Sequence, residues 1–145
     1  MPDAKNFFTT ADKEHITEAI REAEKATSGE IRVHLENNCP EDVLDRAAYL
    51  FDQLRINQTE LRNGVLFYLA VKDRKFAIIG DVGINALVEE HFWEDIKLLM
   101  GEHFKLGEFV TGLQKGIQKA GTKLKKHFPV NTDDVNELSD EISFL

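Results

Sequence analysis

The residues best suited to chemistry in this sequence are oxygen donors that stand beside glycines at the ends of apolar segments. In the segment FAIIGDVGIN, residues 76–85, an apolar run leads into one carboxylate, Asp81, placed between two glycines. Glu30 and Asn63 have glycine neighbours in the same way, and each precedes another apolar segment. Carboxylate and amide oxygens are the ligands that Ca²⁺ and Mg²⁺ prefer. The same residue types also cap helices and form turns, so both a metal site and a cap-and-turn role are open.

Motifs of other chemistries are missing from the sequence. Gly80 and Gly83 lack the G-x-G-x-x-G spacing of a dinucleotide site, and there is no P-loop, H-E-x-x-H, G-x-S-x-G or EF-hand pattern. The single cysteine, Cys39, excludes an internal disulfide and a thiolate zinc cluster. The histidines fall on separate elements and predict no nucleophilic triad; they are His15, His34, His91, His103 and His127.

Length and charge restrict the class of protein. The chain has 145 residues, enough for one domain with a core of its own. Its 18 Lys and Arg against 26 Asp and Glu give a net charge of -8, which disfavours binding to nucleic acid or to an anionic membrane surface. No apolar run approaches the ~20 residues of a membrane span, and the polar N-terminus has no signal-peptide core. We therefore expect a soluble, cytoplasmic monomer whose protein partner, if it has one, the sequence does not identify.

Hydrophobic periodicity predicts four helices and three strands. The helices are expected over about 10–27, 42–54, 83–99 and 109–124, and the strands over 31–36, 65–71 and 76–79. The run at 65–71 is apolar on both faces, as in a central strand. The run at 31–36 alternates, which predicts one buried face and one wetter face that carries His34 and Glu36.

This order of elements predicts an α/β fold, a three-layer α/β/α sandwich with a mixed parallel and antiparallel central sheet. We expect residues 1–129 to form this domain and residues 130–145 to form an acidic tail, flexible or folded back. The tail acids are Asp133, Asp134, Glu137, Asp140 and Glu141, with Ile142, Phe144 and Leu145 as an apolar anchor. The last helix has a lysine face on which the tail or an acidic partner could dock: Lys115, Lys119, Lys123 and Lys126.

The same topology brings the oxygen donors together. Parallel first and second strands begin at the same edge of the sheet, and an antiparallel third strand ends there. Glu30, Asn63 and Asp81 are therefore expected at one edge, as ligands of a divalent cation. Glu94 would supply a further oxygen if its helix leans over that edge.

Three segments resemble the TPM domain family. RNGVLFYLAVKDRKFAIIGDVGI (62–84) is similar to the family's D-N-G-V-L-L strand, its D-R-K turn and its V-G-x-G ending. ATSGEIRVHL (26–35) resembles the T-G-x-E-[IL]-x-V strand, and FKLGEFVTGLQKGI (104–117) resembles the closing F-x-x-G-x-[YF]-x-x-G-[LI] helix. The likeness covers about residues 8–128, and the tail resembles that of short stand-alone bacterial members.

The resemblance implies an α/β/α sandwich and a polar edge formed by Glu30, Asn63 and Asp81. Members include a thylakoid-lumen protein of photosystem repair, ascribed an acid phosphatase activity with a bound divalent cation, as well as membrane-tethered bacterial proteins. Such variety implies a shared binding scaffold more than a shared reaction. Where the family has Asp before Asn-Gly, this chain has Arg62. A positive charge there weakens a cation site or shifts it toward Asp81 and the following helix.

Three hypotheses of function follow. The first is a binding or regulatory module that holds a divalent cation, with Ca²⁺ favoured and Mg²⁺ as the alternative. The second is a metal-dependent acid phosphatase acting on phosphate monoesters at the same edge, for which no nucleophile other than Asp81 is evident. The third is a protein-interaction module that acts without metal through the lysine face and the acidic tail.

Overall fold

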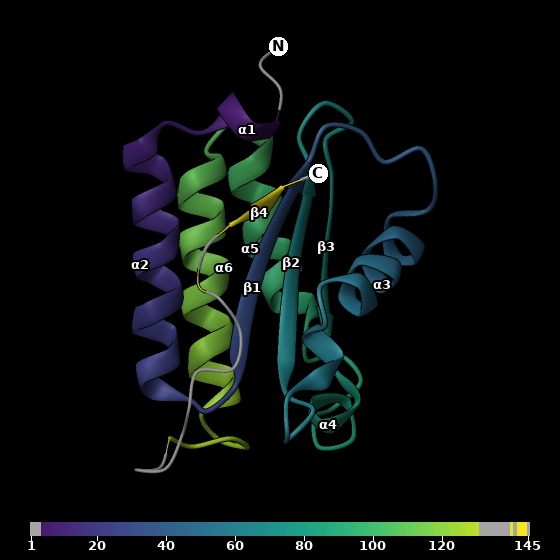
Figure 1. Cartoon of the computed structure of the whole chain (residues 1–145). Coiled ribbons are helices and arrows are strands. Elements are labelled where there is room, and N and C mark those ends of the chain that lie inside the picture. Colours follow the sequence, from purple (N-terminus) through teal and green to yellow (C-terminus); the bar gives the residue numbers. More distant parts are fainter. Residues whose placement is uncertain (1–3, 131–139, 141, 145) are drawn as a thin grey trace.

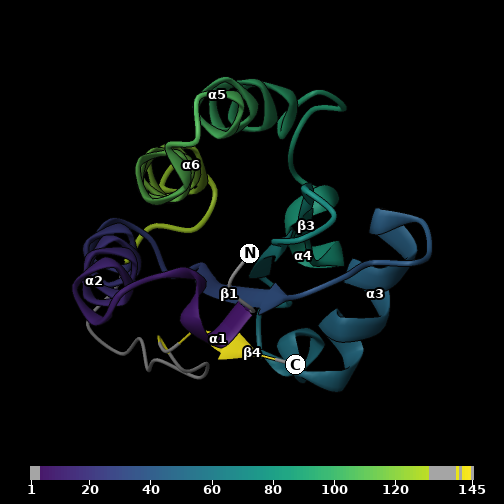
Figure 2. The ribbon, with the colours of Figure 1, turned by 90° about the horizontal axis from the view of Figure 1, so that it is seen from above.

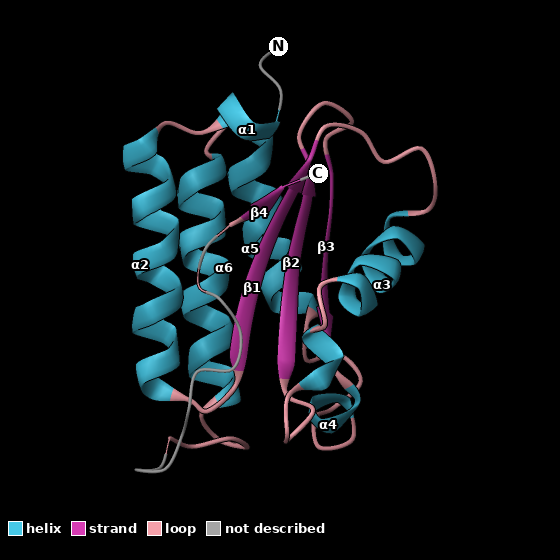
Figure 3. Cartoon of the chain, in the orientation of Figure 1, coloured by secondary structure: helices cyan, strands magenta, loops and turns pink. Residues whose placement is uncertain are grey.

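The computed structural model describes residues 4–130, 140 and 142–144 (Figures 1 and 3). Its elements are α1 (Ala4–Phe7), α2 (Thr10–Ala26), β1 (Glu30–Glu36), α3 (Val43–Gln53), η1 (Ile56–Gln58), β2 (Gly64–Ala70), β3 (Lys75–Gly80), α4 (Val82–Asn85), α5 (Glu94–Lys105), α6 (Phe109–Leu124) and β4 (Ser143–Phe144). The strands form one mixed sheet in the order β3-β2-β1-β4. β1 is parallel to β2 and β4, while β2 and β3 are antiparallel.

Helices cover both faces of this sheet, which confirms the expected three-layer sandwich. In Figure 2, α2, α6 and α5 form one layer and α3 lies on the other side of the strands. α6 packs against both α2 and α5, and α3 packs against β2 and β3. The larger core lies between the sheet and α2, α5 and α6, and the smaller one lies under α3.

The double burial of β2 follows from its sequence. Every residue of this strand is buried, as an all-apolar run in a central strand should be. Because side chains alternate across a strand, Val65, Phe67 and Leu69 belong to the larger core. Leu66 and Tyr68 belong to the smaller core under α3.

Side-chain caps fix where the first long helices begin. Thr9 accepts a hydrogen bond from the N–H of Asp12, whose carboxylate accepts one from the N–H of Thr9, which forms a capping box at α2. Asp42 caps α3 through the N–H groups of Leu44 and Asp45.

The prediction of a single helix from Gly83 to Leu99 is wrong. The chain forms the short α4, then turns, and starts α5 only at Glu94, which leaves Leu87 55% exposed. Contacts to other elements fix the turn. Lys123 of α6 donates a hydrogen bond to the carbonyl oxygen of Phe92, whose side chain is buried in the core. The ring of Trp93 fills the space beside Gly80, where a Cβ would lie 2.4 Å from it.

The described part of the tail docks on β1 and α2. Ser143 pairs with His34 and Phe144 with Leu35, so β4 adds a short parallel strand to β1. The side chains of Ile142 and Phe144 pack against the larger core. The expected tail acids Asp133, Asp134, Glu137 and Glu141 and the anchor residue Leu145 lie outside the described residues. Across the described part of the chain, the helices are all too short or too polar to cross a lipid bilayer.

Two glycines that face different surroundings give a test of the packing between helices. A Cβ at Gly101 of α5 would meet one atom within 4 Å, the Cζ of Phe76 at 3.9 Å, whereas a Cβ at Gly121 of α6 would lie 2.8 Å from the Cβ of Ala23. We expect Gly101→Ala to raise the free energy of unfolding by about 0.5–1 kcal/mol, because alanine has the higher helix propensity. Gly121→Ala gains the same helix propensity but overpacks the contact with α2. It should therefore lower the free energy of unfolding by about 1–3 kcal/mol. Urea unfolding measures the free energy of unfolding of both variants. Equal changes in the two variants would contradict the close contact between α2 and α6.

Candidate functional site

The strand register brings three of the sequence-predicted site residues to one end of the sheet. Glu30 pairs with Gly64 across β1 and β2, and Val65 pairs with Gly80 across β2 and β3. The N–H of Glu30 donates to the carbonyl of Asn63 at 3.2 Å, and the N–H of Asp81 donates to that of Gly64 at 3.0 Å. Glu30, Asn63 and Asp81 therefore lie together at the end of the sheet that carries α4, the lower end in Figure 1. We call this the Asp81 end.

All three side chains at the Asp81 end are buried, although each is polar. Their exposed fractions are 4% for Glu30, 2% for Asn63 and 4% for Asp81. Burial of a polar or charged group is costly unless hydrogen bonds or a countercharge compensate for it. The partners of Asp81 and Asn63 therefore show what these two residues do in this fold.

Asp81 is held by Arg62 and by the helix that follows. Its two carboxylate oxygens accept hydrogen bonds from Nε and Nη2 of Arg62 at 2.8 and 2.9 Å. The N–H of Val82 donates to Oδ1 at 2.7 Å, so Asp81 also caps α4, as the cap interpretation predicts. The pairing with Asp81 raises the pKa of Arg62, whose side chain is 46% exposed.

Glycine at position 83 lets the Arg62 loop approach α4 closely. The N–H of Gly83 donates to the carbonyl oxygen of Arg62 at 3.0 Å. A Cβ at Gly83 would lie 2.3 Å from the carbonyl oxygen of Leu61 and 2.5 Å from that of Arg62, which no larger residue tolerates. Two main-chain oxygens are thus fixed beside the Asp81 cap.

Asn63 ties the start of β2 to the start of β1. Its side-chain Nδ2 donates to the carbonyl oxygen of Ser28 at 3.2 Å. Its Oδ1 accepts from the hydroxyl of Thr59 at 3.4 Å, and the same hydroxyl accepts from the N–H of Asn63 at 3.2 Å. The amide of Asn63 therefore serves as a cross-link between two loops.

A carboxylate that the sequence interpretation missed, Glu24, lies close to Glu30. Its Oε2 accepts from the N–H of Ile31 at 3.0 Å. Burial raises the pKa of Glu24 to about 9, helped by a hydrogen bond with Asp140 and by the negative charges of Asp140 and Glu30. Glu24 stands four residues after Ile20, so it falls on the apolar stripe of α2. This spacing was the signal in the sequence that Glu24 faces the core.

The structure does not gather all four predicted ligands around one point. Gly64 of β2 stands between the strand positions of Glu30 and Asp81, and a Cβ there would lie 2.6 Å from Cγ2 of Ile56. Glu94 is exposed at the first residue of α5. Within residues 4–130, 140 and 142–144, no group of three or more His, Cys, Asp or Glu side chains is arranged to hold a metal ion.

A second buried polar cluster lies at the opposite end of β1, where the sequence predicted a wetter face. That prediction is wrong, because His34 is 0% and Glu36 3% exposed. Arg46 of α3 and the hydroxyl of Tyr68 donate to the carboxylate of Glu36. Burial alone would raise the pKa of Glu36, but these hydrogen bonds lower it. β4 covers His34 from the side of β1 away from β2, and the hydroxyl of Ser143 lies 2.7 Å from Nδ1 of His34. Burial lowers the pKa of His34 to about 4.

Comparisons with known proteins agree on the fold. A family model described as the TPM domain matches residues 1–123. The chain is similar to the BA42 protein of the psychrophilic bacterium Bizionia argentinensis, an NMR structure, with a TM-score of 0.91 and 48% identity over 96% of each chain. No match was found among curated proteins.

Two solved domains of low identity share the fold alone. The N-terminal domain of cg2496 from Corynebacterium glutamicum has a TM-score of 0.66 at 10% identity, over 94% of this chain and 80% of that one. An N-terminal domain from P. gingivalis has a TM-score of 0.69 at 19% identity, over 83% of this chain and 78% of that one.

The raised pKa of Glu24 predicts how stability depends on pH. Unfolding lowers this pKa from about 9 to its ordinary value of 4.5, so between these values the folded chain holds a proton that the unfolded chain has lost. Stability should therefore fall as pH rises through this window. Glu24→Gln removes that dependence, so it should raise the free energy of unfolding by at least about 1 kcal/mol at pH 8 and much less at pH 4.5.

Urea unfolding at a series of pH values checks this prediction. Glu22→Gln is the matched control, because Glu22 is exposed on the same helix and pairs with Lys25. Equal effects of Glu24→Gln at pH 4.5 and pH 8 would show that Glu24 is ionised in the fold.

Proposed function

The chain belongs to the TPM domain family, and from that premise we propose that it is a binding module for a divalent cation, with Ca²⁺ favoured. Asp81 is the central ligand of the proposed site, and Arg62 occupies that site when no ion is bound. The ion would be held by Asp81 in place of the guanidinium. The match of the family model to residues 1–123 supports the scaffold. The chemistry of the donors at the Asp81 end supports the ligand.

The observation that carries this proposal is the charge balance of Asp81. Its carboxylate is 3% exposed, and within the described residues the cation that balances it is the guanidinium of Arg62. A buried carboxylate without a countercharge is strongly unfavourable, so something positive must occupy this place. Arg62 enters from a loop and is half exposed, so its side chain can turn out to solvent without opening the core.

The remaining donors suit a hard cation. Oxygens of two main-chain carbonyls, those of Leu61 and Arg62, lie beside Gly83 in the first turn after the Asp81 cap. Ca²⁺ accepts carboxylate, carbonyl and water oxygens in flexible geometry, whereas Mg²⁺ demands a near-ideal octahedron. Glu30 is buried at the same end and adds negative potential there. It is not counted as a ligand, because Gly64 and Ile56 lie between it and Asp81. Asn63 holds the loops in place through Ser28 and Thr59.

Arg62 explains why this site should be weak. The family pattern has Asp at this position, and an arginine there competes with a metal ion for the same two oxygens of Asp81. Affinity for Ca²⁺ is set by the number of charged ligands and by the rigidity of the site. We therefore expect a dissociation constant on the order of 1 mM, the weak end of known calcium sites.

The phosphatase and metal-free interaction hypotheses stay predictions. A phosphatase at this end would need Asp81 as its nucleophile, and both oxygens of Asp81 are engaged by Arg62 and Val82. For the interaction hypothesis, Lys123 of the lysine face is occupied within the fold by Phe92 and Asp95.

Arg62→Asp tests the proposed competition. Position 62 has a φ of 51°, a backbone that aspartate adopts more readily than most residues. Without metal the variant should have a lower urea midpoint than the natural protein, because Asp81 loses its countercharge. Its affinity for Ca²⁺ should rise at least about tenfold, because a carboxylate replaces a competing cation. NMR titration of amide shifts and calorimetry measure the affinity, and unfolding with and without Ca²⁺ measures the rescue.

Two variants control this experiment. Arg74→Asp makes the same change of charge at another left-handed position, at the far end of the sheet, and should leave Ca²⁺ binding unchanged. Asp81→Asn should abolish the shifts in the natural protein. Shifts confined to other regions, or no tightening in Arg62→Asp, would refute the cation proposal.

A further inference from the structure

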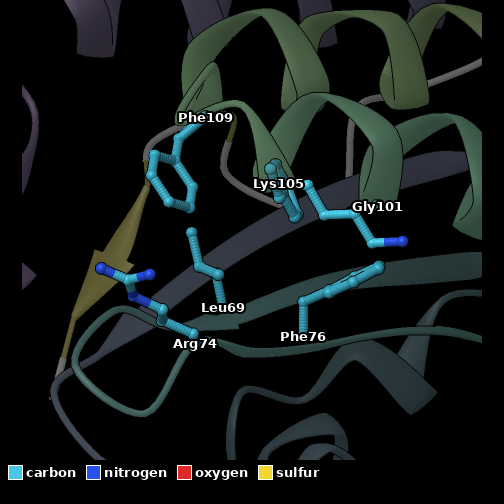
Figure 4. Close-up of a pocket in the computed structure, with 7 residues that line it drawn as sticks. Leu69, Arg74, Phe76, Gly101, Lys105 and Phe109 are labelled. Carbon is cyan, nitrogen blue, oxygen red and sulfur yellow. The ribbon is translucent and has the colours of Figure 1, made fainter.

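We propose that a pocket at the end of the sheet opposite Asp81 binds a small aromatic carboxylate. This hairpin pocket lies between the β2–β3 hairpin, the end of α5 and the start of α6, and has a volume of about 410 Å³ (Figure 4). Its lining includes Leu69, Arg74, Phe76, Phe104, Lys105 and Phe109. None of these residues takes part in the contacts of the Asp81 end.

The walls of the hairpin pocket are aromatic. Phe104 stacks on Phe109 with 5.4 Å between ring centroids and an angle of 26° between planes. Phe76 meets Phe104 edge to face at 5.0 Å. These rings already form offset and edge-to-face pairs, the arrangements that a further aromatic ring joins favourably. Leu69 of β2 adds to the apolar lining and lies between Phe76 and Phe109 in Figure 4.

The space in the pocket depends on a glycine. Gly101 lies on the turn of α5 that faces Phe76, and a Cβ there would meet one atom within 4 Å, the Cζ of Phe76 at 3.9 Å. Any larger residue at 101 would project into this space. The volume falls within the range of ~300–1,000 Å³ that small-molecule sites occupy, toward its lower end, so a ligand with a single ring fits it.

Two cations at the pocket select the charge of the ligand. Arg74 and Lys105 both line it and are both exposed, and neither has an ion-pair partner among the described residues. In Figure 4 they lie on opposite sides of Leu69.

Two carboxylates next in sequence to lining residues are engaged elsewhere. Asp73 accepts from the side chain of Asn38 and from the N–H of Cys39, and Glu108 pairs with His103. In a chain of net charge -8, two cations without acidic partners beside an apolar cavity form a site for an anion with an apolar body.

Arg74 is the residue suited to hold the carboxylate. A guanidinium binds a carboxylate through two parallel hydrogen bonds, which an ammonium group cannot do. Arg74 has a φ of 54°, in the left-handed region, as the tight turn between β2 and β3 requires. Arg74 therefore reaches the pocket from the hairpin turn, while Lys105 adds positive potential from α5. An acid with its ring among the phenylalanines and its carboxylate on Arg74 satisfies both parts of the lining.

An NMR titration of the full chain with 3-phenylpropanoate tests this proposal. We expect saturable amide shifts in residues 69–76 and 101–109, with a dissociation constant below about 1 mM for a ligand of this size. 3-Phenylpropanamide has the same shape without the charge and should bind at least about tenfold more weakly. N-acetylated glycyl-phenylalanine presents the same groups as the end of a peptide, and tighter binding of this probe would overturn the assignment to a small free acid.

Four variants complete the test. Arg74→Asn keeps a residue that tolerates left-handed backbone and should weaken binding at least about fivefold, while Lys105→Gln should weaken it about twofold. Gly101→Leu should fill the pocket and abolish the shifts. Arg55→Asn, at another exposed arginine with left-handed backbone (φ 60°), should leave binding unchanged. The proposal would be overturned by equal binding of the acid and the amide, by unchanged affinity in Arg74→Asn, or by amide shifts elsewhere on the protein. These three results decide the question even if Gly101→Leu fails to fold.

Discussion

β2 is buried on both faces, so its backbone N–H and C=O groups must pair with neighbouring strands rather than with water. β1 supplies these partners in parallel on one side and β3 supplies them in antiparallel on the other. The parallel pairing sets the start of β1 beside the start of β2, and the antiparallel pairing returns the end of β3 to the same place. The Asp81 end follows from this geometry. The β2–β3 hairpin must then lie at the other end, where Arg74 meets α5 and α6.

Two buried carboxylates and one half-buried one show three ways to meet the cost of removing charge from water. Glu36 is held by Arg46 and by a tyrosine hydroxyl, inside a cluster closed by α3. Burial, a hydrogen bond with Asp140 and nearby negative charges raise the pKa of Glu24 to about 9. Asp81 takes a guanidinium from a loop, and this Arg62 side chain is 46% exposed against 22% for Arg46. Of the two ion pairs, the one at Asp81 has the more exposed cationic partner.

Much of the fold was predictable because local chemistry and the final packing agree. The stripe of α6 and the doubly apolar β2 appear where periodicity places them. The failures share one physical cause, which is contact between distant segments. The helix expected from Gly83 is interrupted because Phe92 and Trp93 find partners on other elements. His34 is buried because α3 and β4 cover a face that alternation alone assigns to solvent.

The sequence by itself determined the three long strands, the helices α2, α3 and α6, and the mixed sheet. It also determined the meeting of Glu30, Asn63 and Asp81 at one end, since strand direction follows from the lengths of the connections. Only the tertiary structure decided what those residues do, because hydrogen-bond partners and burial depend on segments far apart in the chain. It placed Arg62 on Asp81 and closed Ile56 over Gly64. It also opened an aromatic pocket between the β2–β3 hairpin and the helices α5 and α6, which no local pattern places beside the hairpin.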